Sequence, residues 1–196
     1  MMPVMRVGIL AFGSMVERPG AEIAARVIRR IEVETPFAAE FARSSRTRDG
    51  APTLVPVSEG GARIPATVLV LDDSAAEDDA RMMLYRRETQ RPADCGTVQA
   101  VTWIARLTGF AGTSTCLYTA LPPNVEPLTA ARLADLAVSS AIAPSGAQHR
   151  DGISYLLDQK LRNVMTPLLA PYEEAVLARA GAVDLADAWE RVRAAS

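Results

Sequence analysis

Residues that bind metals or form cross-links are scarce in this chain of 196 residues, which has one histidine and two cysteines. The cysteines, Cys95 and Cys116, lack the close spacing of paired metal ligands, and two thiols do not make a disulfide framework. His149 does not complete a zinc site with them, because such sites need several ligands in a recognisable spacing. The sequence therefore predicts no bound metal, and its cysteine usage predicts a reducing cytoplasm.

An excess of one charge and long apolar runs are also absent. Acidic residues number 23 and basic residues 21, so the formal net charge is −2 and shows no electrostatic signature of a nucleic-acid-binding protein. No run approaches the ~18 apolar residues of a membrane span, and the first residues have neither the basic start nor the cleavage site of a signal peptide. We therefore expect a cytoplasmic globular protein that binds neither nucleic acid nor a membrane.

Lysine is nearly absent too, and this bears on the first glycine motif. Gly8 and the pair Gly13-Ser14 have the outer spacing of a phosphate-binding loop. Such a loop needs a lysine next to its hydroxyl residue, to contact the β- and γ-phosphates. The chain's one lysine is Lys160, and residues 9–12 are strand-like. The segment is therefore not predicted to bind a nucleotide phosphate.

A serine hydrolase would also need residues that this chain has little of. The G-x-S-x-G motif of many hydrolases is missing. Any catalytic base of the histidine type would have to be His149, which lies in a polar linker between predicted helices. A solvated loop histidine accounts for it better than a general base.

Strands are predicted in the first two thirds of the chain. Short apolar segments that are rich in branched residues and bounded by turn residues are typical of strands. Glu59, Gly60 and Gly61 predict a hairpin turn within residues 53–72. The predicted strands cover residues 4–12, 35–45, the two halves of 53–72, 97–109 and 113–122.

Helices are predicted among and after these strands. Isoleucine and valine recur at helical spacing over residues 21–32, which indicates a short helix. Ser74 and Glu77 have the spacing of a capping box, which predicts a helix that runs to about Arg87. The remaining predicted helices cover residues 128–142, 151–180 and 184–195.

This order of elements, with strands first and helices last, predicts an α+β protein without alternating βαβ units. The sheet is expected to be small and mixed or mostly antiparallel, either a β-barrel or a curled sheet, with helices on its flanks. We expect one domain over residues 1–196. Its β-rich core covers about 4–121 with one clear inserted helix, and its helical part covers about 129–195.

Two segments are candidates for chemistry. The glycine of Phe12-Gly13-Ser14-Met15 lets backbone amides approach a ligand closely, although it also fits an ordinary turn after a strand. Glu88 lies four residues after Leu84 and so at the margin of an apolar helical stripe. There it suits a general base, or a solvated glutamate paired with Arg87 or Arg91.

The segments taken together resemble the gamma-glutamylcyclotransferase family, and its glutathione-specific, ChaC-type branch in particular. The family's Y-G-S-(N/L) loop after the first strand is similar to Phe12-Gly13-Ser14-Met15. Its L-D-x-R-E context for the catalytic glutamate is similar to residues 84–88. Further similar segments are residues 45–52 (SRTRDGAP), 64–72 (IPATVLVLD), 117–124 (LYTALPPN) and 143–156 (APSGAQHRDGISYL).

The resemblance implies the family's fold and a reaction that needs no metal or organic cofactor. In that reaction the α-amine of a gamma-glutamyl group attacks its own γ-carbonyl, which forms 5-oxoproline and releases an amine or amino acid. Glu88 is the implied general acid and base. The implied substrate-binding residues are Phe12, Gly13, Ser14 and Met15, with Tyr118 and Tyr155 as hydroxyl donors.

Other interpretations stay open at this stage. Tyr118 and Tyr155 also fit half-buried tyrosines that pack with a hydrated hydroxyl. The chain is equally compatible with a non-catalytic small-molecule binding module in which Glu88 is a structural ion-pair partner. A third possibility is a cyclotransferase that acts on a gamma-glutamyl amine other than glutathione. The sequence does not predict the oligomeric state.

Overall fold

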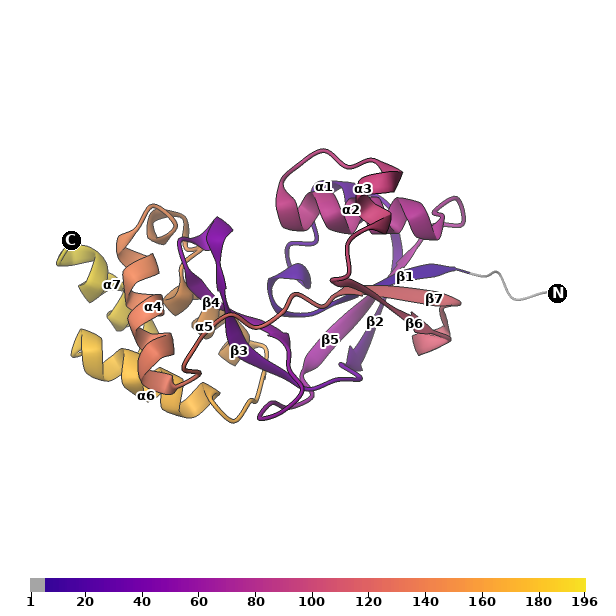
Figure 1. The fold of residues 1–196 in the computed structure, drawn as a ribbon. Helices are drawn as coiled ribbons and strands as arrows, with labels where there is room; N and C mark the ends of the chain where they lie inside the picture. The colour runs from indigo at the N-terminus through magenta and orange to yellow at the C-terminus, as the bar shows by residue number, and fades with distance from the viewer. Residues whose placement is uncertain (1–5) are drawn as a thin grey trace. The chain divides into compact units, whose positions relative to one another are not determined.

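The computed structural model describes residues 6–196, which form two compact units that both contain helices and strands (Figure 1). Unit 1 comprises residues 6–35 and Pro65–Leu121, and unit 2 comprises Pro36–Ile64 and Pro122–Ser196. The mixed α+β class expected from the sequence is confirmed. Among residues 6–196, no helix has the length and apolar character needed to cross a bilayer.

Unit 1 contains a five-stranded sheet in the order β2-β5-β1-β7-β6. Its central strand β1 is buried at every residue, as its apolar composition predicts. The predicted strand 4–12 is confirmed over Val7–Ala11, while Val4 and Met5 lie outside the described residues. The strands are β1 (Val7–Ala11), β2 (Val27–Glu34), β5 (Pro65–Leu71), β6 (Ile104–Thr108) and β7 (Thr115–Thr119).

This sheet is open. β1 pairs antiparallel with β5 and parallel with β7, while the β2–β5 and β6–β7 pairings are antiparallel. The end strands β2 and β6 do not pair with each other within the described chain. The closed barrel, one of the two forms that the sequence left open, is therefore wrong, and the mixed, mostly antiparallel pairing is confirmed.

Helices cover one face of the unit 1 sheet and bury its core (Figure 1). The core contains Ile9 of β1, Leu117 of β7 and Leu84 of the long helix α2, and none of the three has exposed surface. Tyr85 and Trp103 stack at the edge of this cluster, with ring centroids 6.0 Å apart. The helical elements of unit 1 are η1 (Gly13–Met15), α1 (Ala21–Ala24), α2 (Glu77–Thr89), α3 (Cys95–Gln99) and η3 (Phe110–Gly112).

Unit 2 packs helices against a two-stranded antiparallel sheet. Strand β4 contacts α4 and α5, and α6 and α7 complete the helical group. The turn predicted at Asp49-Gly50 joins the two strands, and both residues have positive φ. The elements are β3 (Ala39–Ser45), η2 (Arg46–Arg48), β4 (Ala51–Pro56), α4 (Ala130–Ile142), η4 (Gly146–Gln148), α5 (Gly152–Leu161), α6 (Leu169–Ala180) and α7 (Leu185–Ala194).

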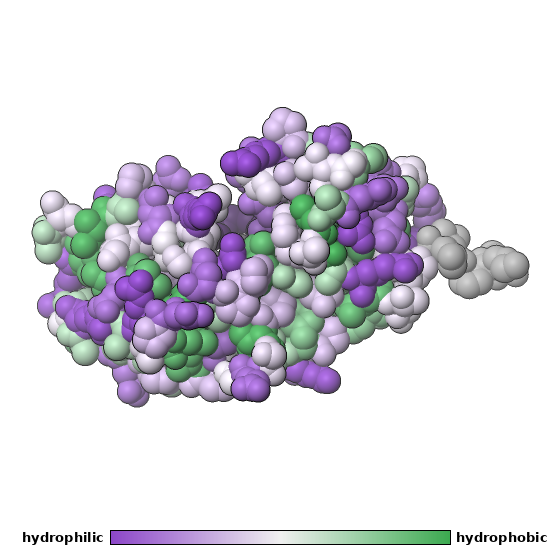
Figure 2. Space-filling view, in the orientation of Figure 1, coloured by the Kyte–Doolittle hydropathy of each residue, from purple (hydrophilic) through white to green (hydrophobic). Residues whose placement is uncertain are grey.

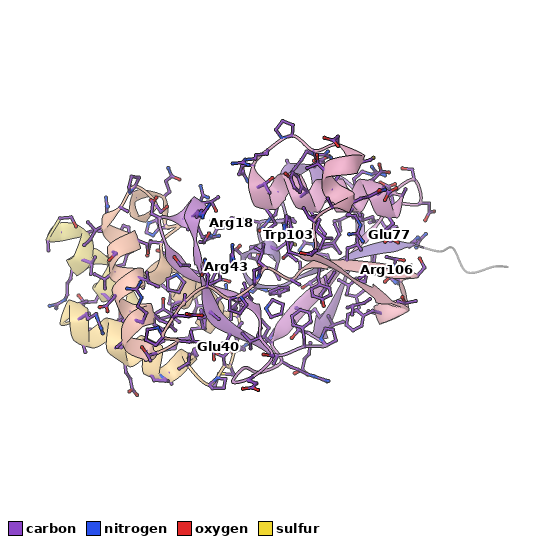
Figure 3. The ribbon with its side chains drawn as sticks, viewed as in Figure 1. Arg18, Glu40, Arg43, Glu77, Trp103 and Arg106 are labelled. Carbon is purple, nitrogen blue, oxygen red and sulfur yellow. The ribbon has the colours of Figure 1, made fainter. Side chains whose placement is uncertain are left out.

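A buried carboxylate holds the segment between α5 and α6 to strand β3. Glu40, which is labelled in Figure 3, belongs to β3 and has no exposed surface. Its Oε1 accepts hydrogen bonds from the Phe41 amide at 2.9 Å and the Thr166 hydroxyl at 2.6 Å. Its Oε2 accepts one from the Leu168 amide at 3.0 Å. Buried polar groups need such partners, so Glu40 and these donors depend on one another.

Four local predictions are wrong. Residues 21–32 are not one helix, because α1 ends at Ala24 and β2 begins at Val27 and pairs with β5. The predicted hairpin at 59–61 does not form, since β4 pairs with β3, whereas β5 pairs with β1 and β2. The predicted strand 97–109 begins at Ile104, and α3 occupies its first residues. The helix predicted over 151–180 is two helices, since α5 ends at Leu161 and α6 begins at Leu169, with Pro167 in the gap.

The predicted helix start is displaced by two residues. Helix α2 begins at Glu77 after Ala76, whose amide donates to Asp79 at 3.1 Å. Ser74 does not cap the helix. Instead its hydroxyl donates to Asp72 at 2.6 Å, and Arg26 pairs with the same carboxylate. Ser74 therefore belongs to the Arg26–Asp72 ion pair, and Asp79 makes the side-chain contact to the helix start that was expected of Glu77.

Gly146 is a position where any side chain would collide with the backbone. A Cβ atom built there would lie 1.8 Å from the Ala141 carbonyl oxygen. We expect Gly146→Ala to lower the free energy of unfolding by about 1–3 kcal/mol, because the backbone must shift to admit the methyl group. Chemical denaturation measures this loss.

The matched control is Gly96→Ala, whose Cβ would meet only the Asp94 side chain, at 3.3 Å. That change is expected to alter stability by less than about 1 kcal/mol, within the range of helix propensities. Equal losses in both variants would contradict the steric explanation.

Hydrophilic and hydrophobic residues are interspersed over the face drawn in Figure 2. Among the described large apolar side chains that are exposed, one belongs to unit 1, Ile28 at the start of β2. The others belong to unit 2: Leu128, Ile142, Leu161, Met165 and Val183.

Candidate functional site

Glu88 lies in the last turn of α2 and is largely withdrawn from solvent. Leu84, one turn earlier, is fully buried in the unit 1 core. The Glu88 side chain is 15% exposed, as expected for a residue at the margin of the apolar stripe. By contrast, Glu77 at the start of α2 is 34% exposed and pairs with Arg106 at 3.3 Å on the surface (Figure 3). The two ends of one helix therefore present carboxylates in different environments.

The guanidinium of Arg87 joins Glu88 to the loop after β1. Its Nη1 donates to Glu88 Oε1, and its Nη2 donates to the Ser14 hydroxyl at 3.3 Å. The same Nη2 donates to the Arg18 carbonyl at 3.1 Å. Arg87 is 19% exposed, so these charge-assisted hydrogen bonds are partly shielded from water. Two of the segments that the sequence analysis singled out, residues 12–15 and Glu88, thus meet through one side chain.

The loop itself offers donors. Gly13 has a φ of 58°, which opens the 3-10 turn η1 directly after the strand. The Met15 amide donates to the Phe12 carbonyl at 3.3 Å, so it is used within the turn. Ser14 therefore places its hydroxyl next to the Arg87–Glu88 pair.

The other two loop residues act mainly through packing. Met15 is 3% exposed and belongs to the unit 1 core, and Phe12 is 8% exposed. Their side chains help to fix the turn. Any direct contact of this loop with a ligand falls to Ser14 and the Gly13 backbone.

Sequence reasoning named Arg87 as one possible partner of Glu88 but missed its bond to Ser14. The two residues are 73 positions apart, so no local pattern could reveal the contact. A Cβ at Gly20, which has a φ of +93°, would lie 3.3 Å from the Arg87 side chain. Gly20 lets the chain pass close to Arg87.

Tyr118 lies on β7, away from the face that α2 covers. Its neighbour Leu117 is buried in the core beneath α2, and successive strand residues point to opposite faces. Burial raises the pKa of the Tyr118 hydroxyl. The alternation does not bring Tyr118 to Glu88.

Tyr155 belongs to the core of unit 2. It is 3% exposed, and its hydroxyl accepts a hydrogen bond from the Leu54 amide at 3.3 Å. Its ring meets Phe41 edge-on, and the Arg48 guanidinium lies 5.2 Å from the ring centroid. These contacts account for Tyr155 as a packed core residue.

The sole histidine is near a serine and an aspartate, but not in the order of a catalytic triad. The Ser154 hydroxyl donates to Asp151 at 2.7 Å and lies 3.4 Å from His149 Nδ1. In a triad the carboxylate orients the imidazole, which in turn receives the serine proton. Here Asp151 also accepts from the Ile153 amide and from Trp189, so it caps α5 and anchors α7. The cluster is structural.

Comparison with known proteins adds no assignment to this geometry. No family model, no curated protein and no solved structure matches the chain significantly.

Proposed function

We propose that this chain is a gamma-glutamyl cyclotransferase whose acid–base residue is Glu88. The observation that supports the proposal is the Arg87 bridge between Glu88 and Ser14. It joins, in unit 1, the two segments whose motifs resemble the catalytic glutamate and the substrate loop of that family. The carboxylate is held and shielded, and hydrogen-bond donors lie beside it. A held and shielded carboxylate suits proton transfer. Donors beside it suit the stabilisation of a developing oxyanion.

In the proposed reaction the substrate's α-amine attacks in its neutral form, and Glu88 takes a proton from this nitrogen. The amine nitrogen then bonds to the γ-carbonyl carbon and closes a five-membered ring. In this scheme the Ser14 hydroxyl and backbone amides of the loop donate to the oxyanion or to the α-carboxylate. Glu88 returns its proton to the leaving nitrogen, the bond from that nitrogen to the γ-carbon breaks, and 5-oxoproline and an amine are released.

Arg87 has two tasks in this scheme. It fixes the orientation of the Glu88 carboxylate, and it keeps Ser14 in register with it. Orientation matters because nucleophile and electrophile belong to one short substrate chain, so most of the barrier reduction comes from holding them correctly.

The second candidate is a binding module without catalysis. The Arg87–Glu88 ion pair favours it, since a paired carboxylate can simply stabilise the end of α2 and the loop. Under this alternative a gamma-glutamyl compound or another small molecule binds unchanged.

Incubation with a panel of gamma-glutamyl compounds separates the two. The panel includes glutathione, gamma-glutamyl dipeptides and gamma-glutamyl amines, at about pH 6 to 9, where the α-amine loses its proton. We expect mass spectrometry to find 5-oxoproline from at least one member, without added metal or nucleotide, and cysteinylglycine if glutathione reacts. Binding of a member without any 5-oxoproline would instead establish the binding module.

A further inference from the structure

Strand β2 ends the unit 1 sheet with an unpaired edge. Its eight residues pair with β5 on one side, and no described strand pairs with its other side (Figure 1). An edge strand presents backbone N–H and C=O groups that can pair with another strand. Its charged residues are solvent-exposed, and Ile28 at its start is 52% exposed. The edge is therefore accessible.

The charges along β2 are divided between its two halves. Arg29 and Arg30 come first, and Glu32 and Glu34 follow. An antiparallel partner with the same sequence would place its acidic half against the basic half of this strand. The pattern is thus complementary to itself in the antiparallel direction.

The faces of β2 follow from its register with β5. Arg30 lies opposite Leu69 and Glu32 opposite Thr67, so both point to the face that carries α2. Ile31 lies opposite Val68 and points to the other face, as Arg29 and Val33 do. The ion-pairing residues and the apolar residues therefore occupy different faces.

We propose that β2 pairs antiparallel with β2 of a second copy of this chain, about a two-fold axis at Ile31. Arg30 of each copy then lies opposite Glu32 of the other, which gives two cross-strand ion pairs on one face. Ile31 meets its own counterpart on the other face. The two sheets become one continuous sheet across an isologous interface.

Other registers are less favourable. In an antiparallel pair, side chains in directly opposite positions share a face. A two-fold axis midway between two residues would pair side chains from opposite faces, so the axis must pass through a residue. An axis at Arg30 places the two copies of Arg30 opposite each other, and an axis at Glu32 does the same for Glu32. An axis at Val33 sets Glu32 against Glu34. Like charges in opposite positions destabilise a sheet, so Ile31 is the centre that avoids them.

Arg30 is available for this role. Its Nη1 donates to the Val16 carbonyl at 2.9 Å, which holds the guanidinium beside the strand. A guanidinium has five N–H donors, and the others remain for a carboxylate across the interface. The proposal concerns the oligomeric state and holds whether or not the protein is a cyclotransferase.

Charge reversal tests the interface by analytical ultracentrifugation over a range of concentrations. We expect the wild type to dimerise, and Arg30→Glu and Glu32→Arg each to weaken the dimer by about tenfold or more, since attraction becomes repulsion at both pairs. The double variant Arg30→Glu/Glu32→Arg restores opposite charges and is expected to dimerise again. Arg63→Glu, an exposed change in unit 2, is the control and leaves the dimer intact.

Mixing gives the sharpest result. Arg30→Glu has two acidic residues in the contact and Glu32→Arg has two basic ones. Each alone is expected to dimerise about tenfold or more weakly than the wild type, and the two are expected to form a heterodimer when combined. A monomeric wild type would overturn the proposal. So would folded single variants that dimerise as the wild type does, or a mixture without heterodimer; circular dichroism verifies folding.

Discussion

Replacement of Glu88 by glutamine is expected to leave the protein folded and to lower kcat by about 10²-fold or more, the usual contribution of a positioned acid–base residue. The carboxamide keeps the shape of the side chain and can still accept a hydrogen bond from Arg87. It cannot take a proton from the substrate's amine. The rate of 5-oxoproline formation under saturating substrate measures the effect.

Glu77→Gln is the matched control, because Glu77 lies on the same helix but pairs with Arg81 and Arg106 at the surface. That variant is expected to keep wild-type kcat. Full activity in Glu88→Gln would exclude Glu88 as the base. Equal losses in both variants would indicate damage to α2 instead of loss of a proton acceptor.

Glu40→Ala is expected to lower the free energy of unfolding by about 3 kcal/mol or more. The change leaves three donors without their acceptor, the buried Phe41 amide and Thr166 hydroxyl and the partly buried Leu168 amide. Each buried unsatisfied group costs about 1–3 kcal/mol. Denaturant unfolding at equilibrium measures the loss.

Two further variants calibrate that result. Glu40→Gln retains one acceptor oxygen, so its loss is expected to be smaller than that of Glu40→Ala. Glu59→Ala, at an exposed position, is expected to change stability by no more than about 0.5 kcal/mol. A loss below about 1 kcal/mol in Glu40→Ala would contradict the role given to this carboxylate, because even one buried donor without an acceptor costs about that much or more.

Sequence patterns predicted the elements whose signal is local. The apolar run of β1 and the helices predicted over 128–142 and 184–195 are confirmed, whereas the helix predicted over 151–180 is divided into α5 and α6. Residues 21–32 were predicted wrongly because isoleucine and valine at that spacing also suit a strand, and pairing with β5 decided the outcome. The hairpin at 59–61 failed for a similar reason: which strands pair is a property of the whole sheet.

The candidate site was predictable only in parts. Glu88 and the Gly13-Ser14 turn could be identified from the sequence, because each lies at the end of a regular element. Their connection through Arg87 could not be predicted, because it joins residues that are 73 positions apart in the chain. Tyr118 and Tyr155 were singled out by motif alone. Strand alternation places Tyr118 on the face of the sheet opposite α2, and packing in unit 2 gives the Tyr155 hydroxyl a hydrogen bond from the Leu54 amide.

The most direct test of the proposed function is the fate of a reactive gamma-glutamyl compound in H₂¹⁸O, followed by mass spectrometry beside an enzyme-free sample. Cyclisation uses the substrate's own amine, so we predict 5-oxoproline without ¹⁸O, formed in equal amount to the released amine and lost in Glu88→Gln. Release of glutamate that carries ¹⁸O would show hydrolysis and contradict the proposal. Unchanged substrate across the whole panel would contradict it as well.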